Sequence, residues 1–229
     1  MTDSSLEILY NSKQTEYFGW SRSDMVQYVP TSARKILDVG CGSAGFSGNL
    51  KTHLTAEVWG VELNQAASEV ARGRLDRVFH APFGPELDIP KNYFDCIIFN
   101  DVLEHMLDPL AALQLAVSLL SEKGVIVASI PNIGHFPILW KLAIRGAWDY
   151  KDCGILDKTH LRFFTRSSIK KMFDQAGLEV RRVEGINGFC NMEEDGQKLW
   201  WRYRLISWLP ARGVHDMRYL QFAVVAGKK

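Results

Sequence analysis

The stretch "KILDVGCGSAGF", Lys35 to Phe46, joins an apolar run to three glycines spaced G-x-G-x-x-G. This pattern predicts a buried strand, a tight turn and a helix that begins at the turn, an arrangement typical of nucleotide binding. Asp38 lies two residues before the first glycine, where its carboxylate would repel a pyrophosphate and suit a cation or an ammonium group. The stretch therefore predicts an adenosine-bearing ligand and leaves its kind open.

The rest of the chain alternates between apolar runs and helical patterns. Strands are expected over 35–40, 56–63, 77–81, 94–100 and 124–131, with helices over 44–54, 64–75 and 108–120 between them. Beyond Pro131 we expect helices over 137–145 and 165–177 and two final strands over 178–186 and 217–227. Such alternation predicts an α/β fold, with a parallel sheet and helices on both of its faces.

Composition excludes several classes of protein. The 229 residues carry 27 basic and 26 acidic side chains, a net charge of +1, which argues against a general binder of nucleic acid or anionic membranes. The 4 cysteines show no C-x-x-C pair, so we expect them to be reduced. No secretory signal is visible and no apolar run approaches the ~20 residues of a membrane span. We expect a cytoplasmic protein.

A second acidic residue supports the nucleoside ligand. Glu62 ends the second predicted strand, 20 residues after Gly42, where a carboxylate can accept hydrogen bonds from both ribose hydroxyls. Both nicotinamide and other adenosine cofactors use a carboxylate in this way. Glu62 thus predicts adenosine, and Asp38 argues against a nicotinamide oxidoreductase.

The segments "ILDVGCGSAG", "VELN", "FDCIIFNDVLEH" and "GVIVASIPN" resemble the class I S-adenosylmethionine-dependent methyltransferases, over about residues 17–229. The resemblance implies a Rossmann-like seven-stranded sheet, mostly parallel with an antiparallel last strand. It also implies S-adenosylmethionine as the cofactor. The expected cofactor-binding residues are Asp38, Gly40, Cys41, Gly42, Gly45, Glu62, Leu63, Asn100 and Arg22.

The chain departs from that family at two places. Ala44 replaces the third glycine of the family's tighter loop, and His80 and Ala81 stand where the family usually has an acidic residue for the adenine amino group. Backbone groups would then have to contact the adenine.

A narrower resemblance covers the flanking segments. "YFGWSRSDMVQYVP" and "LDKTHLRFFTRSSIKKMFDQAGLEV" are similar to a bacterial subset often associated with glycosyltransferases and surface-polysaccharide synthesis. We expect one methyltransferase domain over 1–229, with a helical cap in 1–30 and acceptor-side insertions at 132–165 and 188–215. The segment 198–210, "KLWWRYRLISWLP", is a candidate lid, peripheral membrane contact or core helix.

Candidate catalytic residues cluster in "NDVLEHM", where Asp101, Glu104 and His105 are spaced i, i+3 and i+4. On a helix they would share one face, and His105 could act as general base. Alternatively, the three could bind a divalent metal, as the resemblance to ubiquinone-pathway and small-RNA 2′-O-methyltransferases implies, with His160 at the place of a later histidine. A structural role is the third alternative. The prediction assigns proton handling to His105, His160 and Glu104.

The expected reaction is O-methylation of a small-molecule or sugar hydroxyl. Three other functions stay open at this point: metal-assisted 2′-O-methylation of RNA, a non-catalytic methyltransferase-like binding protein and a nicotinamide oxidoreductase. His135, which follows the fifth predicted strand, is a further candidate for substrate contact.

Overall fold

A computed structural model describes residues 22–188, 208 and 212–229 of the chain. Its strands form one sheet in the order β3-β2-β1-β4-β5-β7-β6. Their bounds are β1 Lys35–Val39, β2 Glu57–Glu62, β3 Arg77–His80, β4 Phe94–Asn100, β5 Leu120–Pro131, β6 Leu178–Gly188 and β7 Tyr219–Lys228. The strand order reverses between β1 and β4, which makes the edge beyond their carboxyl ends the expected ligand site.

The direction of the strands confirms the expected fold class. The five strands β3, β2, β1, β4 and β5 are parallel to one another, whereas β7 is antiparallel to both β5 and β6. As a result, β7 begins at the edge where the parallel strands end, and its residue Gln221 pairs with Pro131 at the end of β5. The predicted seven-stranded sheet with an antiparallel last strand is confirmed.

Helices connect the strands, and polar side chains cap the start of α3 and α6. The α-helices are α2 Gly45–His53, α3 Gln65–Arg72, α4 Pro109–Leu119, α5 Phe136–Arg145, α6 Arg166–Gln175 and α8 Arg212–Asp216, and two short 3-10 helices are η2 Ser23–Tyr28 and η3 Leu103–His105. The Asn64 side chain accepts a hydrogen bond at the start of α3, and Thr165 does so at the start of α6.

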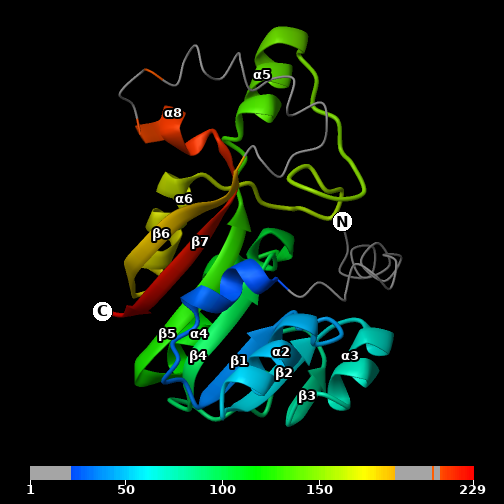
Figure 1. The fold of residues 1–229 in the computed structure, drawn as a ribbon, viewed down its shortest axis with the longest axis vertical. Coiled ribbons are helices and arrows are strands. Elements are labelled where there is room, and N and C mark those ends of the chain that lie inside the picture. Colours follow the sequence, from blue (N-terminus) through cyan, green and yellow to red (C-terminus); the bar gives the residue numbers. More distant parts are fainter. Residues whose placement is uncertain (1–21, 189–207, 209–211) are drawn as a thin grey trace.

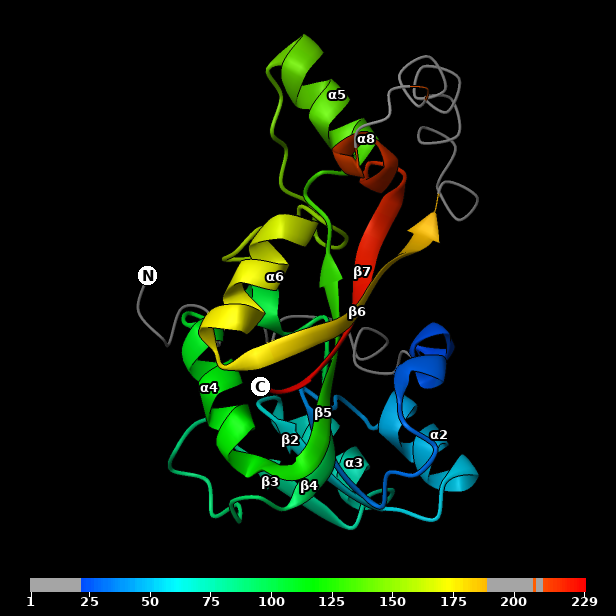
Figure 2. The same ribbon diagram turned by 90° about the vertical axis from the view of Figure 1, so that its left-hand side faces the viewer.

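Apolar side chains fill the space on both faces of the sheet. Leu113 of α4 and Phe173 of α6 are fully buried against one face, in the same cluster as Phe99. Met25 of η2 and Leu50 of α2 belong to the cluster on the other face. Figure 2 shows α4 and α6 on one side of the sheet and α2 on the other. Burial of two faces explains why the strands read as continuous apolar runs.

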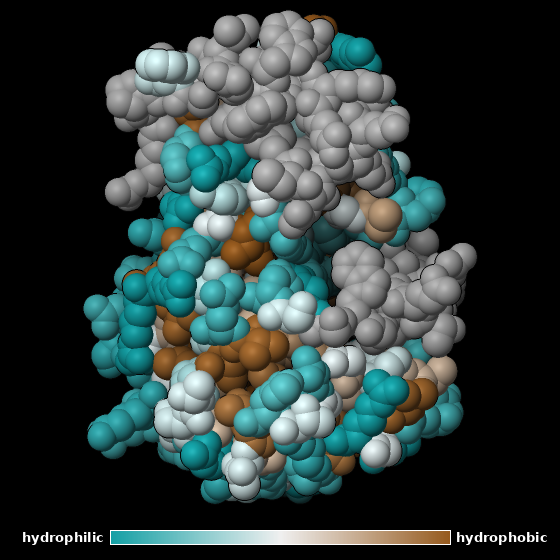
Figure 3. Space-filling model, in the orientation of Figure 1, coloured by the Kyte–Doolittle hydropathy of each residue, from teal (hydrophilic) through white to brown (hydrophobic). Residues whose placement is uncertain are grey.

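The elements that follow β5 and precede β7 lie beyond the carboxyl ends of the strands. Figure 1 shows α5 and α8 at this end, above the sheet. On the molecular face drawn in Figure 3, apolar side chains gather in the lower centre, within a rim of polar ones. Within the described ranges, no helix is long and apolar enough to cross a membrane.

Candidate active site

One large cavity, of about 1160 Å³, opens at the carboxyl edge of the sheet. The loop after β1, the ends of β2 and β4, the segment after β3, helix α4, the 153–160 segment and the start of β7 all contribute to its lining. Every residue predicted to bind the cofactor lines it except Gly45, which is the first residue of α2. The parallel strands bring these groups together because they all end at the same edge.

The glycine loop leaves no room for a side chain at Gly40. Gly40 has a φ of +71°, and a Cβ atom on it would lie 2.6 Å from Cγ2 of Val102. Gly42 also has a positive φ, of 53°. Ala44 adopts the left-handed conformation, with a φ of 58°, where the family has a glycine. The loop therefore keeps the shape expected for close approach of a ligand, including at the substituted position.

Asp38 lies at the end of β1 with 2% of its surface exposed. Burial, and then the nearby Glu62, raise the pKa of its carboxyl from 3.8 to about 7. A cation that binds beside this buried carboxyl group would stabilise its ionised form. This is the behaviour expected of a group that binds the ammonium of an amino-acid ligand.

Glu62 connects the two loops that enclose the ligand edge. Its carboxylate accepts hydrogen bonds from the backbone N–H of Gly42 at 2.8 Å and of Asn64 at 2.7 Å. The side chain is 1% exposed and lines the cavity. Because each carboxylate oxygen has more than one lone pair, these bonds leave acceptor capacity for ribose hydroxyls.

Asn100 ends β4 and faces the same cavity. Neither its amide oxygen nor its amide nitrogen has a hydrogen-bond partner within the part of the chain described. Buried polar atoms without partners are costly, so a ligand that supplies a donor and an acceptor here would be favoured.

The segment after β3 supplies an apolar wall in place of the expected acid. Ala81, Pro82 and Phe83 line the cavity, whereas His80 is exposed and its Nε2 lies 3.0 Å from the carbonyl of Leu63. The ring of Phe83 packs edge-on against Phe99 of β4. This wall suits the flat faces of a purine, while the missing acid leaves the purine edge to backbone groups.

Asp101 does not share a face with Glu104 and His105, which corrects that part of the prediction. The residue has a φ of 54°, so the chain turns sharply after β4, and only Leu103–His105 form a helical turn. The Asp101 carboxylate pairs with Arg22 and accepts a hydrogen bond from Gln221 at 2.7 Å. Asp101 is therefore held away from the other two by groups that are distant in the sequence.

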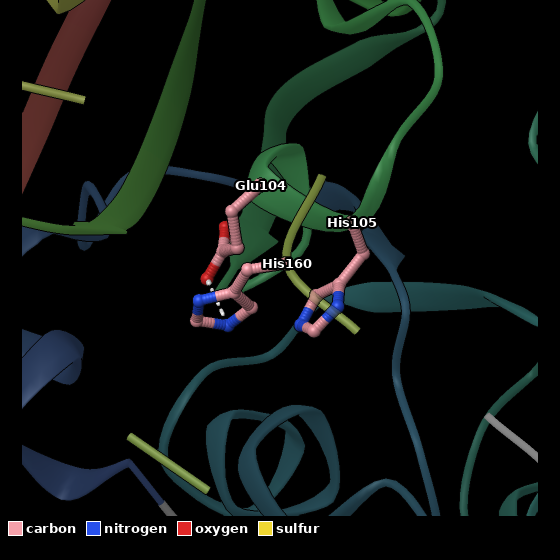
Figure 4. A group of neighbouring side chains, drawn as sticks. All are labelled: Glu104, His105 and His160. Carbon is pink, nitrogen blue, oxygen red and sulfur yellow. Dashed lines mark ion pairs between the residues drawn. The ribbon is translucent and has the colours of Figure 1, made fainter. Parts of the chain in front are cut away.

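Glu104, His105 and His160 take the place of the predicted trio. Their ligating atoms all lie within 4.8 Å of one another, and His160 Nε2 is 3.9 Å from Glu104 Oε1 (Figure 4). The two imidazole rings are edge-to-face, with centroids 4.7 Å apart. All three residues line the cavity. The fold thus brings His160 to Glu104 and His105, as the position-based match to a later histidine implied.

Backbone carbonyls orient both imidazoles. Nδ1 of His105 lies 3.1 Å from the carbonyl of Thr159, and Nδ1 of His160 lies 2.9 Å from that of Ile155. A carbonyl can only accept, so each Nδ1 carries the proton in the neutral ring, and each Nε2 carries the lone pair. The basic nitrogens are therefore the Nε2 atoms, and that of His160 lies beside Glu104.

The Glu104 side chain is 1% exposed, and burial raises the pKa of its carboxyl to about 8. Neither carboxyl oxygen has a hydrogen-bond partner among residues 22–188, 208 and 212–229. Its cavity position and raised pKa favour a role with a proton, a cation or a hydrogen-bond donor.

Two further candidates have different outcomes. His135 does not line the cavity; it is buried at the start of α5, where its Nδ1 lies 3.0 Å from the carbonyl of Met217, and burial lowers its pKa to about 4. It is a neutral residue that connects α5 to the start of β7. Of the segment 198–210, only Trp208 lies within the described residues, and it is exposed.

Gln221 and Asn187 line the cavity and were not predicted. The antiparallel direction of β7 brings its first residues to the ligand edge, and β6 ends there too. The amide of Asn187 donates to Gln221 at 2.9 Å. The predicted antiparallel last strand could have indicated both residues, because an antiparallel strand begins at the edge where the parallel strands end.

Comparison with known proteins agrees with this geometry. Residues 11–183 match the family model described as "Methyltransferase domain". The chain is similar to a "Ubiquinone biosynthesis O-methyltransferase" of Dinoroseobacter shibae, 31% identical over 170 residues, which cover 71% of this chain and 67% of the relative. An O-methyltransferase of Penicillium expansum is 26% identical, over 68% of this chain and 64% of the relative. A solved SAM-dependent methyltransferase from Archaeoglobus fulgidus shares the fold, with a TM-score of 0.65, 19% identity and complete coverage of both chains.

Proposed function

The chain belongs to the methyltransferase-domain family and uses S-adenosylmethionine, and we propose that it methylates a hydroxyl group of a small molecule. The observation that carries the proposal is that a single cavity holds both the cofactor-binding groups of β1, β2 and β4 and the cluster of Glu104, His105 and His160. The relatives' names support an oxygen acceptor.

The residues of the loop edge fit the cofactor. Asp38 would bind the methionine ammonium, Glu62 the ribose hydroxyls, and the Asn100 amide a further polar group of the ligand. Gly40 and Gly42 allow its close approach because they carry no side chain. The bound cofactor supplies an electrophilic methyl group on a sulfonium, so the protein has to position the acceptor and remove its proton.

We assign proton removal to the histidine pair. The Nε2 lone pair of His160 or His105 would accept the hydroxyl proton, and Glu104 would stabilise the resulting imidazolium, since it lies 3.9 Å from His160 Nε2. Divalent-metal activation of the hydroxyl is the competing arrangement. It is favoured by the three ligand atoms within 4.8 Å and by the Nδ1 contacts to carbonyls, which metal-binding histidines commonly make.

The first experiment measures cofactor class. Calorimetric titration with S-adenosylhomocysteine is expected to show binding by the wild type, and with NADH none. Asp38→Ala should lose most of this affinity, while Asp88→Ala, at an exposed site, should keep it. Absence of S-adenosylhomocysteine binding would overturn the proposal, and binding of NADH alone would favour an oxidoreductase.

A second experiment separates the general base from the metal. The protein is dialysed against EDTA, and turnover of an acceptor is measured before and after addition of Mg²⁺ or Zn²⁺. Retained activity after chelation is expected for the histidine base. Loss of activity that a divalent ion restores would assign Glu104, His105 and His160 to a metal site instead.

We propose that the protein acts in the cytoplasm. We also propose that a sugar hydroxyl is one of the acceptors it can methylate. Reduced cysteines support the former: Cys153 is exposed, and Cys41 and Cys96 are buried without a disulfide. The similarity of the flanking segments to polysaccharide-associated enzymes supports the latter. Acceptor turnover with catechols and with methyl glycosides is the direct comparison.

A further inference from the structure

Most of the ionisable side chains that the structure describes along the cavity are acidic. Among the described residues that line it, six carry carboxyl groups and one carries a guanidinium. The six are Asp38, Glu62, Asp101, Glu104, Asp108 and Asp157. An anionic acceptor would have to enter against this charge, because low-dielectric walls strengthen like-charge repulsion. The proposed cofactor contacts would account for Asp38 and Glu62, and the other four acids line the same cavity.

The guanidinium of Arg22, the one found among the described lining residues, is already engaged. It donates to both carboxyl oxygens of Asp24 and to the side-chain oxygen of Gln221, and it pairs with Asp101. These contacts use four of the five N–H groups that a guanidinium carries. The fifth can serve the cofactor's own carboxylate, so Arg22 offers no bidentate site for a phosphate or carboxylate of the acceptor.

The acceptor side of the cavity presents one buried acid, Glu104, whose carboxyl oxygens accept no hydrogen bond from the described residues. Glu104 is 1% exposed, faces the cavity and has neither carboxyl oxygen hydrogen-bonded among the described residues. Asp157, also 1% exposed, accepts from the N–H and Oγ1 of Thr159 at 2.8 and 2.7 Å and adds negative potential near Glu104. A hydroxyl or ammonium group at Glu104 would supply the hydrogen bond that these buried carboxyl oxygens do not receive from the described residues.

We propose that the acceptor is an uncharged or cationic molecule, held through an O–H or N–H donor by Glu104, and that the site discriminates against acceptors carrying phosphate or carboxylate. This inference rests on the proposed function and narrows it. It excludes nucleotide-linked and phosphorylated sugars from the acceptor class, and RNA with them. Free hydroxylated aromatics, amines and neutral glycosides remain.

The test uses two cofactor analogues that differ in charge where the methyl group is transferred. S-adenosylhomocysteine has a neutral thioether there, and sinefungin an ammonium group. Affinities of both are measured by calorimetry at pH 8 for the wild type, Glu104→Gln and Glu122→Gln, a matched control at an exposed position on β5 outside the cavity. The ratio of the two affinities reports the potential at the acceptor side and needs no acceptor.

The preference for sinefungin is expected to fall by about tenfold in Glu104→Gln and to stay unchanged in Glu122→Gln, because glutamine cannot supply the negative charge that the Glu104 carboxylate places near the ammonium. An unchanged ratio in Glu104→Gln would overturn the inference. Failure of both analogues to bind the wild type would instead overturn the proposed function.

A second arm compares acceptors in matched pairs: catechol with 3,4-dihydroxybenzoate, and methyl glucoside with glucose 6-phosphate. The uncharged member should be turned over at least about tenfold faster in any productive pair. Equal or faster turnover of an anionic member would contradict the inference. If neither pair is turned over, the calorimetric comparison of the two cofactor analogues still tests the inference.

Discussion

The buried carboxyl of Asp38 gives the protein a specific dependence of stability on pH. In the unfolded chain this group has a pKa of 3.8, and in the fold burial raises the pKa to about 7. Between these values the folded state keeps a proton that the unfolded state has lost. The free energy of unfolding therefore decreases as the pH rises through this window, by about 1.4 kcal/mol per pH unit for this group.

Asp38→Asn removes that dependence, because asparagine stays neutral in both states. The difference in the free energy of unfolding between variant and wild type should therefore grow in favour of the variant from pH 4 to pH 7. Summed over the window, it reaches about 4 kcal/mol and stays constant at higher pH. Any pH-independent effect of the amide only shifts the whole curve, so the slope is the quantity that tests the argument.

The assay is urea unfolding followed by circular dichroism at half-unit steps from pH 5 to pH 8. Asp88→Asn, at a fully exposed carboxyl, is the control and should run parallel to the wild type. Saturating S-adenosylhomocysteine should flatten the wild-type curve, since its ammonium would stabilise the ionised carboxylate, and leave Asp38→Asn unaffected. Parallel curves for the wild type and Asp38→Asn would refute both the raised pKa and the cation-binding role.

Three further substitutions test other parts of the structure. Gly40→Ala should destabilise the fold by about 2–4 kcal/mol and weaken S-adenosylhomocysteine binding, because of the positive φ and the 2.6 Å approach to Val102. The control is Gly213→Ala, at an exposed position outside the cavity with open space around it, and equal urea midpoints for the two variants would contradict the close packing at Gly40. His160→Gln should lower turnover by about 10²- to 10⁴-fold and leave the affinity for S-adenosylhomocysteine unchanged. His53→Gln, at an exposed position, is the control and should change neither quantity. A parallel loss of affinity in His160→Gln would indicate a structural role for this histidine. Phe173→Ala, in the core between α6 and the sheet, should cost about 3–5 kcal/mol in urea unfolding, and a loss below about 1 kcal/mol would show that this core is not close-packed.

The part of the cavity that the strand ends form could largely be predicted from the sequence. Asp38 and Glu62 were placed at strand ends by the apolar runs before them, and parallel strands must end at one edge. The glycines of the loop marked the turn itself. These are local patterns, and each was interpreted within a few residues.

The arrangement of Asp101, Glu104 and His105 could be predicted from the sequence only in part. The spacing in "NDVLEHM" predicted one face for Asp101, Glu104 and His105, but Asp101 takes a positive φ that its contacts with Arg22 and Gln221 hold in place. Gln221 lies 120 residues from Asp101 along the chain. No local sequence pattern predicts a contact between residues so far apart along the chain.

By itself, then, the sequence determined the element order, the class of sheet and the cofactor edge, because burial periodicity and glycine turns are properties of neighbouring residues. Only the tertiary structure decided which acids are free to meet a ligand. Arg22 and the first residues of β7 take Asp101 out of the cluster, while the segment before α6 brings His160 in. Both outcomes depend on contacts between distant segments, which exist once the two faces of the sheet have packed.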